Sequence, residues 1–309
     1  MQPHPYYQAI LDAYRKLDRP YFHQLSPEQG RAMMKATIAA APKPGDLPEL
    51  AAITDGAISG PHGSIPIRRY TPITQERGTC LYFHAGGWVI GDLDIADNFC
   101  RRLADAACCE LISVDYRLAP EYPFPVPLDD AYAALQWLLK EKPGPVVLVG
   151  ESAGGNLAAA CSILARNEGL GPIHGQFLAY PVTDHDFTTP SYQELGSLNW
   201  LLSTKDMRFY WDQYCPSSSE RDNPLVSPLR LSDVSNLPPT MLFAAELDPL
   251  RDEGLAYAQK LAGAGIPVTT RCDPGMLHGY MAAVGAIPVA TEAFTEAARW
   301  IRQRLAASL

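Results

Sequence analysis

The chain lacks any uninterrupted apolar run near 18 residues, the length that a membrane-spanning helix needs. It also lacks an excess of positive charge, because 25 Lys and Arg stand against 34 Asp and Glu, which leaves a net charge of −9. Nucleic acids and anionic membranes attract basic surfaces, so neither is expected as a partner. A chain of 309 residues, 47% hydrophobic and 19% charged, is instead typical of a folded protein with a large core. Small molecules are therefore the expected partners.

Cysteines at the spacing of a metal site or a disulfide framework are also missing. The seven cysteines are scattered along the chain, with one adjacent pair, and no CxxC occurs. This pattern argues against a disulfide framework or a thiolate zinc site, and it favours buried, reduced thiols. The first 20 residues lack the basic start, the apolar stretch and the small-residue cleavage site of an exported protein. We therefore expect a cytoplasmic protein.

Motifs for cofactors and metals are absent as well. The sequence contains no HExxH, no P-loop and no GxGxxG at the required spacing, and LAGAG is better explained as the end of a helix. We therefore expect neither a cofactor nor a metal. The sequence does not decide whether the chain forms a homodimer.

What the sequence does contain, from about residue 79 onward, is an alternation of short apolar runs and longer helical patterns. This alternation predicts a mostly parallel sheet covered by helices on both faces. The predicted strands span residues 79–84, 110–116, 145–150, 175–181, 240–246 and 266–273. The predicted helices span residues 94–108, 127–142, 152–169, 252–265 and 291–305, with Gly169 and Gly263 at C-terminal ends. Before them, residues 51–60 and 63–72 predict two antiparallel strands at a sheet edge.

Two segments interrupt this alternation, and both are rich in large apolar residues. One is the N-terminal stretch, and the other falls between two strands and is far longer than an ordinary crossover. We predict that they form one helical cap. The resulting division is 1–45 for the N-terminal part of the cap, 46–184 for the core, 185–237 for the cap insertion and 238–309 for the remaining core.

Aromatic residues of the cap have two equally good interpretations, which are ordinary core packing and the lining of a pocket. For the second role we select Trp200 and Phe209 in the insertion, together with Trp88. These three are the predicted substrate-binding residues.

The motif VLVGESAGGN contains GxSxG, with Ser152 between Gly150 and Gly154. A buried strand precedes the motif and a helical pattern follows it at once, as a nucleophile elbow requires. Small residues two positions before and after the serine permit a strained turn that exposes its hydroxyl at a helix N-terminus. The alternative, a serine that only caps an ordinary helix, accounts for less of the pattern. Ser152 is the predicted nucleophile.

An acyl-transfer serine needs hydrogen-bond donors for the oxyanion of its intermediate. The strand at 79–84 ends in His84, Ala85, Gly86, Gly87 and Trp88, where glycines let backbone amides approach a substrate. We predict the amides of Gly86, Gly87 and Ala153 as the donors. His84 is expected to tie this loop together through a side-chain hydrogen bond, without proton transfer.

The base and the acid follow from chain order, which in this type of site is serine, acid, histidine. Of the seven histidines, only His278 lies in a polar, glycine-flanked loop after the last strand. Asp248 is the predicted acid because it is nearest to the end of a strand and precedes Pro249, which suits the first turn of a helix. Its competitors are Glu246, Asp252 and Glu253.

These motifs together resemble the hormone-sensitive lipase family of α/β-hydrolases, in its bacterial carboxylesterase branch. The resemblance covers nearly the whole chain, through HAGGW for the family's HGGG loop, VDYRLAPEYPFPVPLDD for its YRLAPE segment, GESAGGN for GDSAGG, LDPLRDE for DPLxDE and HGY for HGF. It implies an eight-stranded α/β-hydrolase sheet under a helical cap, and the same triad and oxyanion donors. Ala85 replaces a usual glycine and Glu151 a usual aspartate, and neither change removes a catalytic group.

The YRLAPE segment has no separate chemistry, and we expect Arg117 and Glu121 to form a structural ion pair. The function expected is hydrolysis of short- to medium-chain carboxylic esters through a serine acyl-enzyme. Two alternatives stay open at this point. One is a hydrolase-fold ligand-binding protein without turnover, and the other is an amidase or peptidase with the same triad.

Overall fold

The computed structural model describes residues 2–40, 47–74 and 78–306, and within them one eight-stranded sheet has the order β1-β2-β4-β3-β5-β6-β7-β8. The strands are β1 (Ala52–Gly60), β2 (Gly63–Thr71), β3 (Thr79–Phe83), β4 (Glu110–Val114), β5 (Val146–Glu151), β6 (Gly175–Ala179), β7 (Thr240–Leu247) and β8 (Val268–Leu277). β1 pairs antiparallel with β2 and β2 with β4, whereas every other pairing is parallel. The predicted mostly parallel sheet is confirmed.

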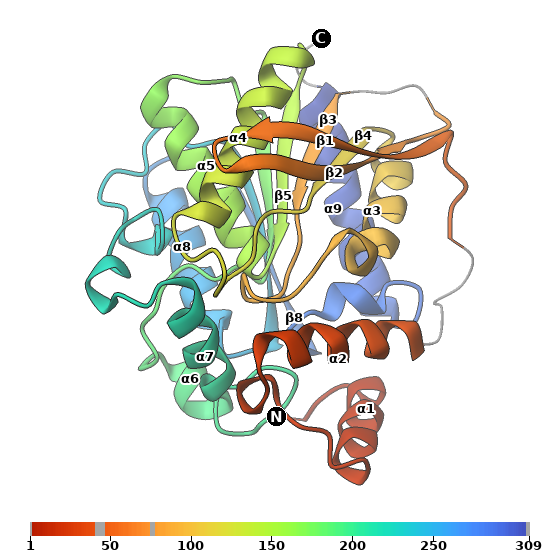
Figure 1. Ribbon diagram of the computed structural model, residues 1–309, viewed down its shortest axis with the longest axis vertical. Coiled ribbons are helices and arrows are strands. Elements are labelled where there is room, and N and C mark those ends of the chain that lie inside the picture. Colours follow the sequence, from red (N-terminus) through yellow and green to blue (C-terminus); the bar gives the residue numbers. More distant parts are fainter. Residues whose placement is uncertain (1, 41–46, 75–77, 307–309) are drawn as a thin grey trace.

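Helices cover both faces of the sheet (Figure 1). α4 (Val126–Glu141), α5 (Ala153–Glu168) and α8 (Arg251–Gly263) pack on one face, and α3 (Leu93–Ala107) and α9 (Pro288–Ala306) pack on the other. Side chains of β3 alternate between the two cores, because Leu81 and Phe83 join one cluster while Cys80 and Tyr82 join the other. A strand buried on both faces must be apolar throughout, which explains the continuous runs in the sequence.

Three local details differ from or refine the predicted boundaries. β8 continues to Leu277, beyond the predicted end at residue 273, because a register shift in its pairing with β7 lets Leu247 pair with Leu277. His278 therefore follows the strand directly. α5 ends at Glu168 and is followed by Gly169 in the left-handed conformation, at the predicted end of this helix; α8 ends at Gly263, as predicted, and the left-handed residue after it is Gly265.

The α-helices of the two segments predicted as a cap lie at one end of the molecule, while the last part of the insertion runs beside α8 (Figure 1). The N-terminal segment forms α1 (Pro5–Lys16), the short helix η1 (Phe22–Gln24) and α2 (Pro27–Ala40), and the insertion contributes α6 (Pro190–Leu195) and α7 (Thr204–Tyr214). His23 joins the two, with its Nδ1 atom 2.7 Å from Asp206 Oδ1 in α7. The predicted boundary between residues 45 and 46 lies outside the described residues. Among the helices that the structure describes, none is both long and apolar enough to span a bilayer.

Candidate active site

Ser152 occupies a tight turn between the end of β5 and the start of α5. Its backbone has φ of 55° and ψ of −119°, a conformation that is strained for a residue with a side chain. Gly150 and Gly154 leave no room for a Cβ atom, because one at Gly150 would overlap the carbonyl of Gly154 and one at Gly154 would overlap the carbonyl of Phe83. The two glycines of GxSxG are therefore needed for the chain to turn this closely.

The structure brings Ser152, His278 and Asp248 together from the ends of three strands. Ser152 Oγ lies 2.9 Å from His278 Nε2, and His278 Nδ1 lies 2.7 Å from Asp248 Oδ2. Asp248 is fully buried, and its other oxygen accepts the amide hydrogen of Leu250 at 3.0 Å. Such a chain of contacts can take a proton from a serine hydroxyl and hold the resulting imidazolium beside a carboxylate.

The three competing acids contact other groups. Glu246 Oε2 accepts the amide hydrogen of Gly275 at 2.7 Å, and Asp252 Oδ2 accepts that of Ser191 at 2.7 Å. Glu253 is buried, and its Oε1 atom accepts the amide hydrogen of Thr183 at 2.7 Å. Of the four acids, only Asp248 is in contact with His278.

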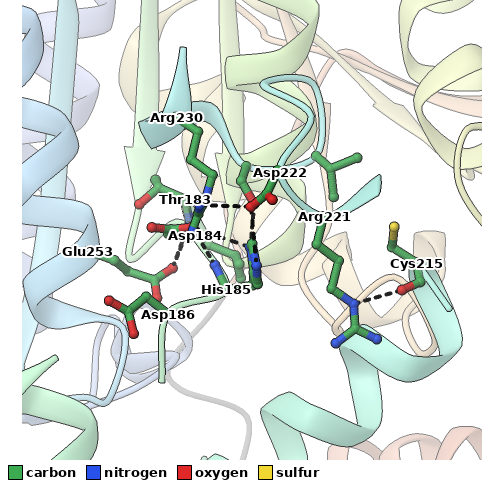
Figure 2. A network of polar contacts seen from close by, with 12 residues as sticks. Thr183, Asp184, His185, Asp186, Cys215, Arg221, Asp222, Arg230 and Glu253 are labelled. Carbon is green, nitrogen blue, oxygen red and sulfur yellow. Dashed lines mark hydrogen bonds and ion pairs between the residues drawn. The ribbon is translucent and has the colours of Figure 1, made fainter. Parts of the chain in front are cut away.

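Glu253 belongs to a polar network at the base of the insertion, which Figure 2 shows. Its Oε1 also accepts the amide hydrogen of Asp184, whose Oδ1 accepts a hydrogen bond from Arg230 Nε at 2.6 Å. Arg230 Nη1 also lies 2.8 Å from Asp222 Oδ1. Because Asp184 precedes the predicted insertion and Arg230 lies near its end, this network ties the two ends of the insertion to α8.

The loop after β3 carries the predicted oxyanion donors. Gly86 has φ of 128° and Gly87 has φ of 59°, both in the region that favours glycine, whereas Ala85 does not have a positive φ. A Cβ atom at Gly86 would overlap the carbonyl of Ile90, and one at Gly87 would overlap the ring of Tyr210 in α7. Within the described chain, the amides of Gly86, Gly87 and Ala153 donate no hydrogen bond, so they are free to bind an external oxygen.

His84 lies beneath this loop and has the structural contacts predicted for it. Its Nδ1 atom is 2.8 Å from the carbonyl oxygen of Ala85, and its ring stacks on Tyr116 with centroids 4.2 Å apart. Burial lowers the pKa of His84 to about 4, so the ring is neutral at physiological pH. A neutral ring held in this way supports the loop.

Glu151 lies beside the nucleophile with its carboxylate buried. The carboxylate accepts hydrogen bonds from the hydroxyls of Tyr82 and Tyr180, and the ring of Tyr180 meets that of His278 edge-on with centroids 5.0 Å apart. Burial raises the pKa of Glu151, while the hydrogen bonds from the two tyrosines oppose that shift. The longer side chain that replaces the family's aspartate is therefore accommodated by two hydroxyl donors.

Trp88 does not line a pocket, so this prediction is wrong. Its side chain is fully buried and stacks on Tyr214, with ring centroids 4.1 Å apart, and it also packs against Trp211. A left-handed backbone at Trp88, with φ of 59°, turns the side chain into this aromatic cluster. Trp200 and Phe209 are both half-buried, and Phe209 packs edge-on against Tyr210.

The predicted ion pair between Arg117 and Glu121 is also absent. Arg117 instead donates to Asp130, with Nη1 2.6 Å from Oδ1, and Glu121 pairs with Arg31 of α2. Asp130 is fully buried, so a nearby cation satisfies a charge that would otherwise be unpaired.

No local motif marks Arg31 or Tyr210, two residues that contact the loop of Gly86 and Gly87. The sequence alone therefore did not reveal their roles.

Among the described residues, no group of three or more His, Cys, Asp and Glu side chains is arranged to hold a metal ion. The reactive geometry consists of the serine, the histidine, the aspartate and the free backbone amides.

Comparisons with known proteins identify the family of the chain. A model of a family described by its alpha/beta hydrolase fold matches residues 80–282. Esterase LipI of Mycobacterium tuberculosis is 37% identical over 281 residues, which is 87% of each chain. The ethyl acetate hydrolase of Pseudomonas putida is 34% identical over 312 residues, or 97% of each chain. Among solved structures, the thermostable esterase from Pseudomonas putida ECU1011 superposes with a TM-score of 0.93 at 31% identity, over 98% of each chain.

Proposed function

Because the chain belongs to the hormone-sensitive lipase family of α/β-hydrolases and is a serine carboxylesterase, we propose that Ser152, His278 and Asp248 are its catalytic triad. The observation that carries this assignment is the unbroken contact from Ser152 Oγ to His278 Nε2, at 2.9 Å, and from His278 Nδ1 to Asp248, at 2.7 Å. Asp248 holds the imidazole in the tautomer with its proton on Nδ1, which leaves Nε2 ready to accept the serine proton.

Acylation begins when Ser152 Oγ attacks the ester carbonyl carbon and its proton passes to His278 Nε2. The carbonyl oxygen becomes an oxyanion, which accepts hydrogen bonds from the amides of Gly86, Gly87 and Ala153. When the intermediate collapses, the bond to the alcohol oxygen breaks and His278 gives its proton to the departing alcohol. Water then attacks the acyl-enzyme with His278 again as base, which releases the acid and restores Ser152.

The cap suggests a bounded pocket. We infer that residues 1–45 and 185–237 act as one cap, because its pieces contact the segments that carry Asp248 and His278. The amide of His4 donates to the carbonyl of Gly275 at 2.9 Å, and the hydroxyl of Ser191 donates to the carbonyl of Pro249, directly after Asp248, at 2.7 Å. Each methylene of an acyl chain contributes about 0.8 kcal/mol to binding until the pocket is full. Specificity is then highest for short and medium acyl chains.

One named relative acts on a short ester, since it is called an ethyl acetate hydrolase, and this supports the same substrate class here. The test is a series of 4-nitrophenyl acetate, butyrate, octanoate and palmitate, with one anilide to measure amidase activity. We expect kcat/KM to peak at acyl chains of about two to eight carbons, without a jump when the substrate forms an emulsion. A maximum at palmitate would contradict the bounded pocket, and a faster anilide would contradict the preference for esters.

The assignment of the nucleophile has its own test. A fluorophosphonate should add once to the protein, and peptide mapping should place the adduct on Ser152. The Ser152→Ala variant should remain unlabelled, whereas Ser218→Ala, which changes an exposed serine of the insertion, should be labelled like the wild type. Labelling at another residue would refute the proposed triad.

We also infer a cytoplasmic location. All seven cysteines are free thiols, and Cys80 and Cys109 are buried with their sulfur atoms 3.5 Å apart and not joined by a disulfide. Such a pair is expected in a reducing compartment. Fractionation of the source cells with an antibody to the protein would test this location.

A further inference from the structure

The loop that carries Gly86 and Gly87 has few bonds of its own. Among the described residues, its internal backbone hydrogen bonds come from the amides of Val89 and Ile90, which both donate to the carbonyl of Gly86, and His84 Nδ1 contacts the carbonyl of Ala85. The two glycines lie in backbone conformations that other residues rarely adopt, so the loop is not held by local preference. Its shape must be maintained from outside.

Arg31 of α2 stabilises one side of the loop through hydrogen bonds to backbone carbonyls. Its Nε atom donates to the carbonyl of Val89 at 2.8 Å, and its Nη2 atom donates to the carbonyl of Ala119 at 3.0 Å. The amide of Ala119 in turn donates to the carbonyl of Trp88 at 2.9 Å. Two successive carbonyls of the loop, those of Trp88 and Val89, are therefore fixed through Ala119 and Arg31.

Glu121 orients the guanidinium group of Arg31 for this purpose. Its two carboxylate oxygens accept hydrogen bonds from Nη1 and Nη2 at 2.8 and 2.6 Å, which is the bidentate geometry of an arginine–carboxylate pair. These hydrogen bonds lower the pKa of Glu121, so the carboxylate stays charged at neutral pH. A planar group with five donors can serve the carboxylate and both carbonyls at once, whereas a lysine ammonium cannot reproduce that fork.

The contribution of this pair to global stability is expected to be small. The side chain of Arg31 is 28% exposed and that of Glu121 is 52% exposed, and ion pairs at such surfaces contribute little to the free energy of unfolding. The hydrogen bonds to Val89 and Ala119 nevertheless lie within a few residues of the amides that face the substrate. The effect of Arg31 should therefore fall on the geometry of the loop.

We propose that Arg31 is a positioning residue for the oxyanion hole: held by Glu121, it fixes the carbonyls of Val89 and Ala119 and so the direction of the Gly86 and Gly87 amides. This proposal rests on the proposed function, in which those amides stabilise the oxyanion. It assigns to the N-terminal part of the cap a role in the chemical step.

The experiment compares Arg31→Ala and Arg31→Lys with Arg15→Ala, which removes an exposed arginine of α1 whose ion-pair partner among the described residues is its neighbour Asp12. For 4-nitrophenyl butyrate at 20 °C, we expect kcat to fall about tenfold to a hundredfold in Arg31→Ala, because misplaced oxyanion donors are less costly than lost ones. KM should change less than threefold. Arg31→Lys should recover only part of the loss, and Arg15→Ala should behave like the wild type.

A second measurement separates positioning from a structural role. A trifluoromethyl ketone forms an oxyanion when Ser152 adds to its carbonyl, so its affinity should fall in Arg31→Ala by the same factor as kcat. The affinity of the corresponding alcohol, which forms no oxyanion, should not change. Glu121→Gln should give a smaller loss, and adding it to Arg31→Ala should cause little further loss.

Several outcomes would overturn the proposal. One is a kcat and a ketone affinity within twofold of the wild type in Arg31→Ala and in Arg31→Lys. Another is an equal loss of affinity for ketone and alcohol. If Arg31→Ala does not fold, Arg31→Lys and Glu121→Gln supply the same comparison. Failure of the proposed function is a different result, because Ser152→Ala would then keep its esterase activity.

Discussion

The two halves of the active site are built in different ways. The proposed triad consists of side chains that directly follow strands of the parallel sheet. Its members contact one another through His278, and Asp248 also accepts the amide hydrogen of Leu250. The oxyanion loop consists of backbone amides, and its supports come from distant segments, namely Arg31 of α2, Ala119 and the ring of Tyr210 in α7. The sheet fixes the positions of side chains at the ends of its strands. The backbone donors of a glycine loop are not fixed in this way, and their positions depend on contacts with other segments.

This difference predicts that changes to the triad act directly on chemistry, whereas changes around the loop act through geometry. The largest expected effect is that of Ser152→Ala. Without the nucleophile no acyl-enzyme can form, and turnover should fall by about a millionfold, as in serine proteases. A chelator should leave the wild type unaffected. Nitrophenyl ester assays test both statements, and a loss of activity that added metal reverses would contradict the serine mechanism.

The next largest effect is expected for Asp248→Asn. The asparagine amide carries no negative charge and can present its NH2 group to Nδ1 of His278, which favours the wrong imidazole tautomer, so kcat should fall by about ten-thousandfold. Asp252→Asn is the matched control, because Asp252 lies four positions further along the chain, contacts Ser191 and does not contact His278. Its kcat should stay within a few-fold of the wild type. Equal losses in the two variants would argue against Asp248 as the orienting acid.

A smaller effect is expected on the loop side, for Gly87→Ala. The methyl group would overlap the ring of Tyr210, and alanine tolerates a φ of 59° poorly, so the adjacent amide must move. We expect kcat to fall by about a hundredfold with little change in KM. Gly263→Ala is the control, since a Cβ atom there meets no other atom within 4 Å, and it should retain full activity. A fully active Gly87→Ala would show that the contact with Tyr210 does not hold the loop.

The smallest effect concerns Asp115, which directly follows β4, the neighbour of β3 in the sheet. Burial, with help from the nearby charge of Asp92, raises its pKa from 3.8 to about 6. The folded state therefore holds this proton more tightly than the unfolded state, so the free energy of unfolding decreases as the pH rises from about 4 to about 6. Asp115→Asn should lack this decrease.

Urea unfolding of the wild type and Asp115→Asn at pH 4.5 and pH 7 measures the difference. Because the side chain is only half-buried and solvent screens its charge, we expect the variant to gain about 1 kcal/mol relative to the wild type between the two pH values. A gap that does not change with pH would show that the folded structure does not perturb this carboxyl.

The residues of the proposed triad could be selected from the sequence because short-range patterns mark them. Ser152 is marked by the two glycines and by the strand and helix around it, and His278 and Asp248 are marked by their places after strands. Parallel strands bring their carboxyl ends to one edge of a sheet, so residues at those ends meet whatever the chain does elsewhere. The alternation of strands and helices predicted the α/β order, and the motifs with their family resemblance predicted the esterase class, and the comparisons confirm both.

Only the tertiary structure decided what surrounds the loop. Trp88 follows a glycine pair in the sequence and was expected in the pocket, yet its ring lies in a core formed with Trp211 and Tyr214. Glu121 was expected to pair with Arg117, yet its partner is Arg31, 90 positions away. Motifs describe residues that are close in the chain. A contact between distant segments depends on how the cap packs against the sheet, and only the sum of the contacts in the folded chain determines that packing.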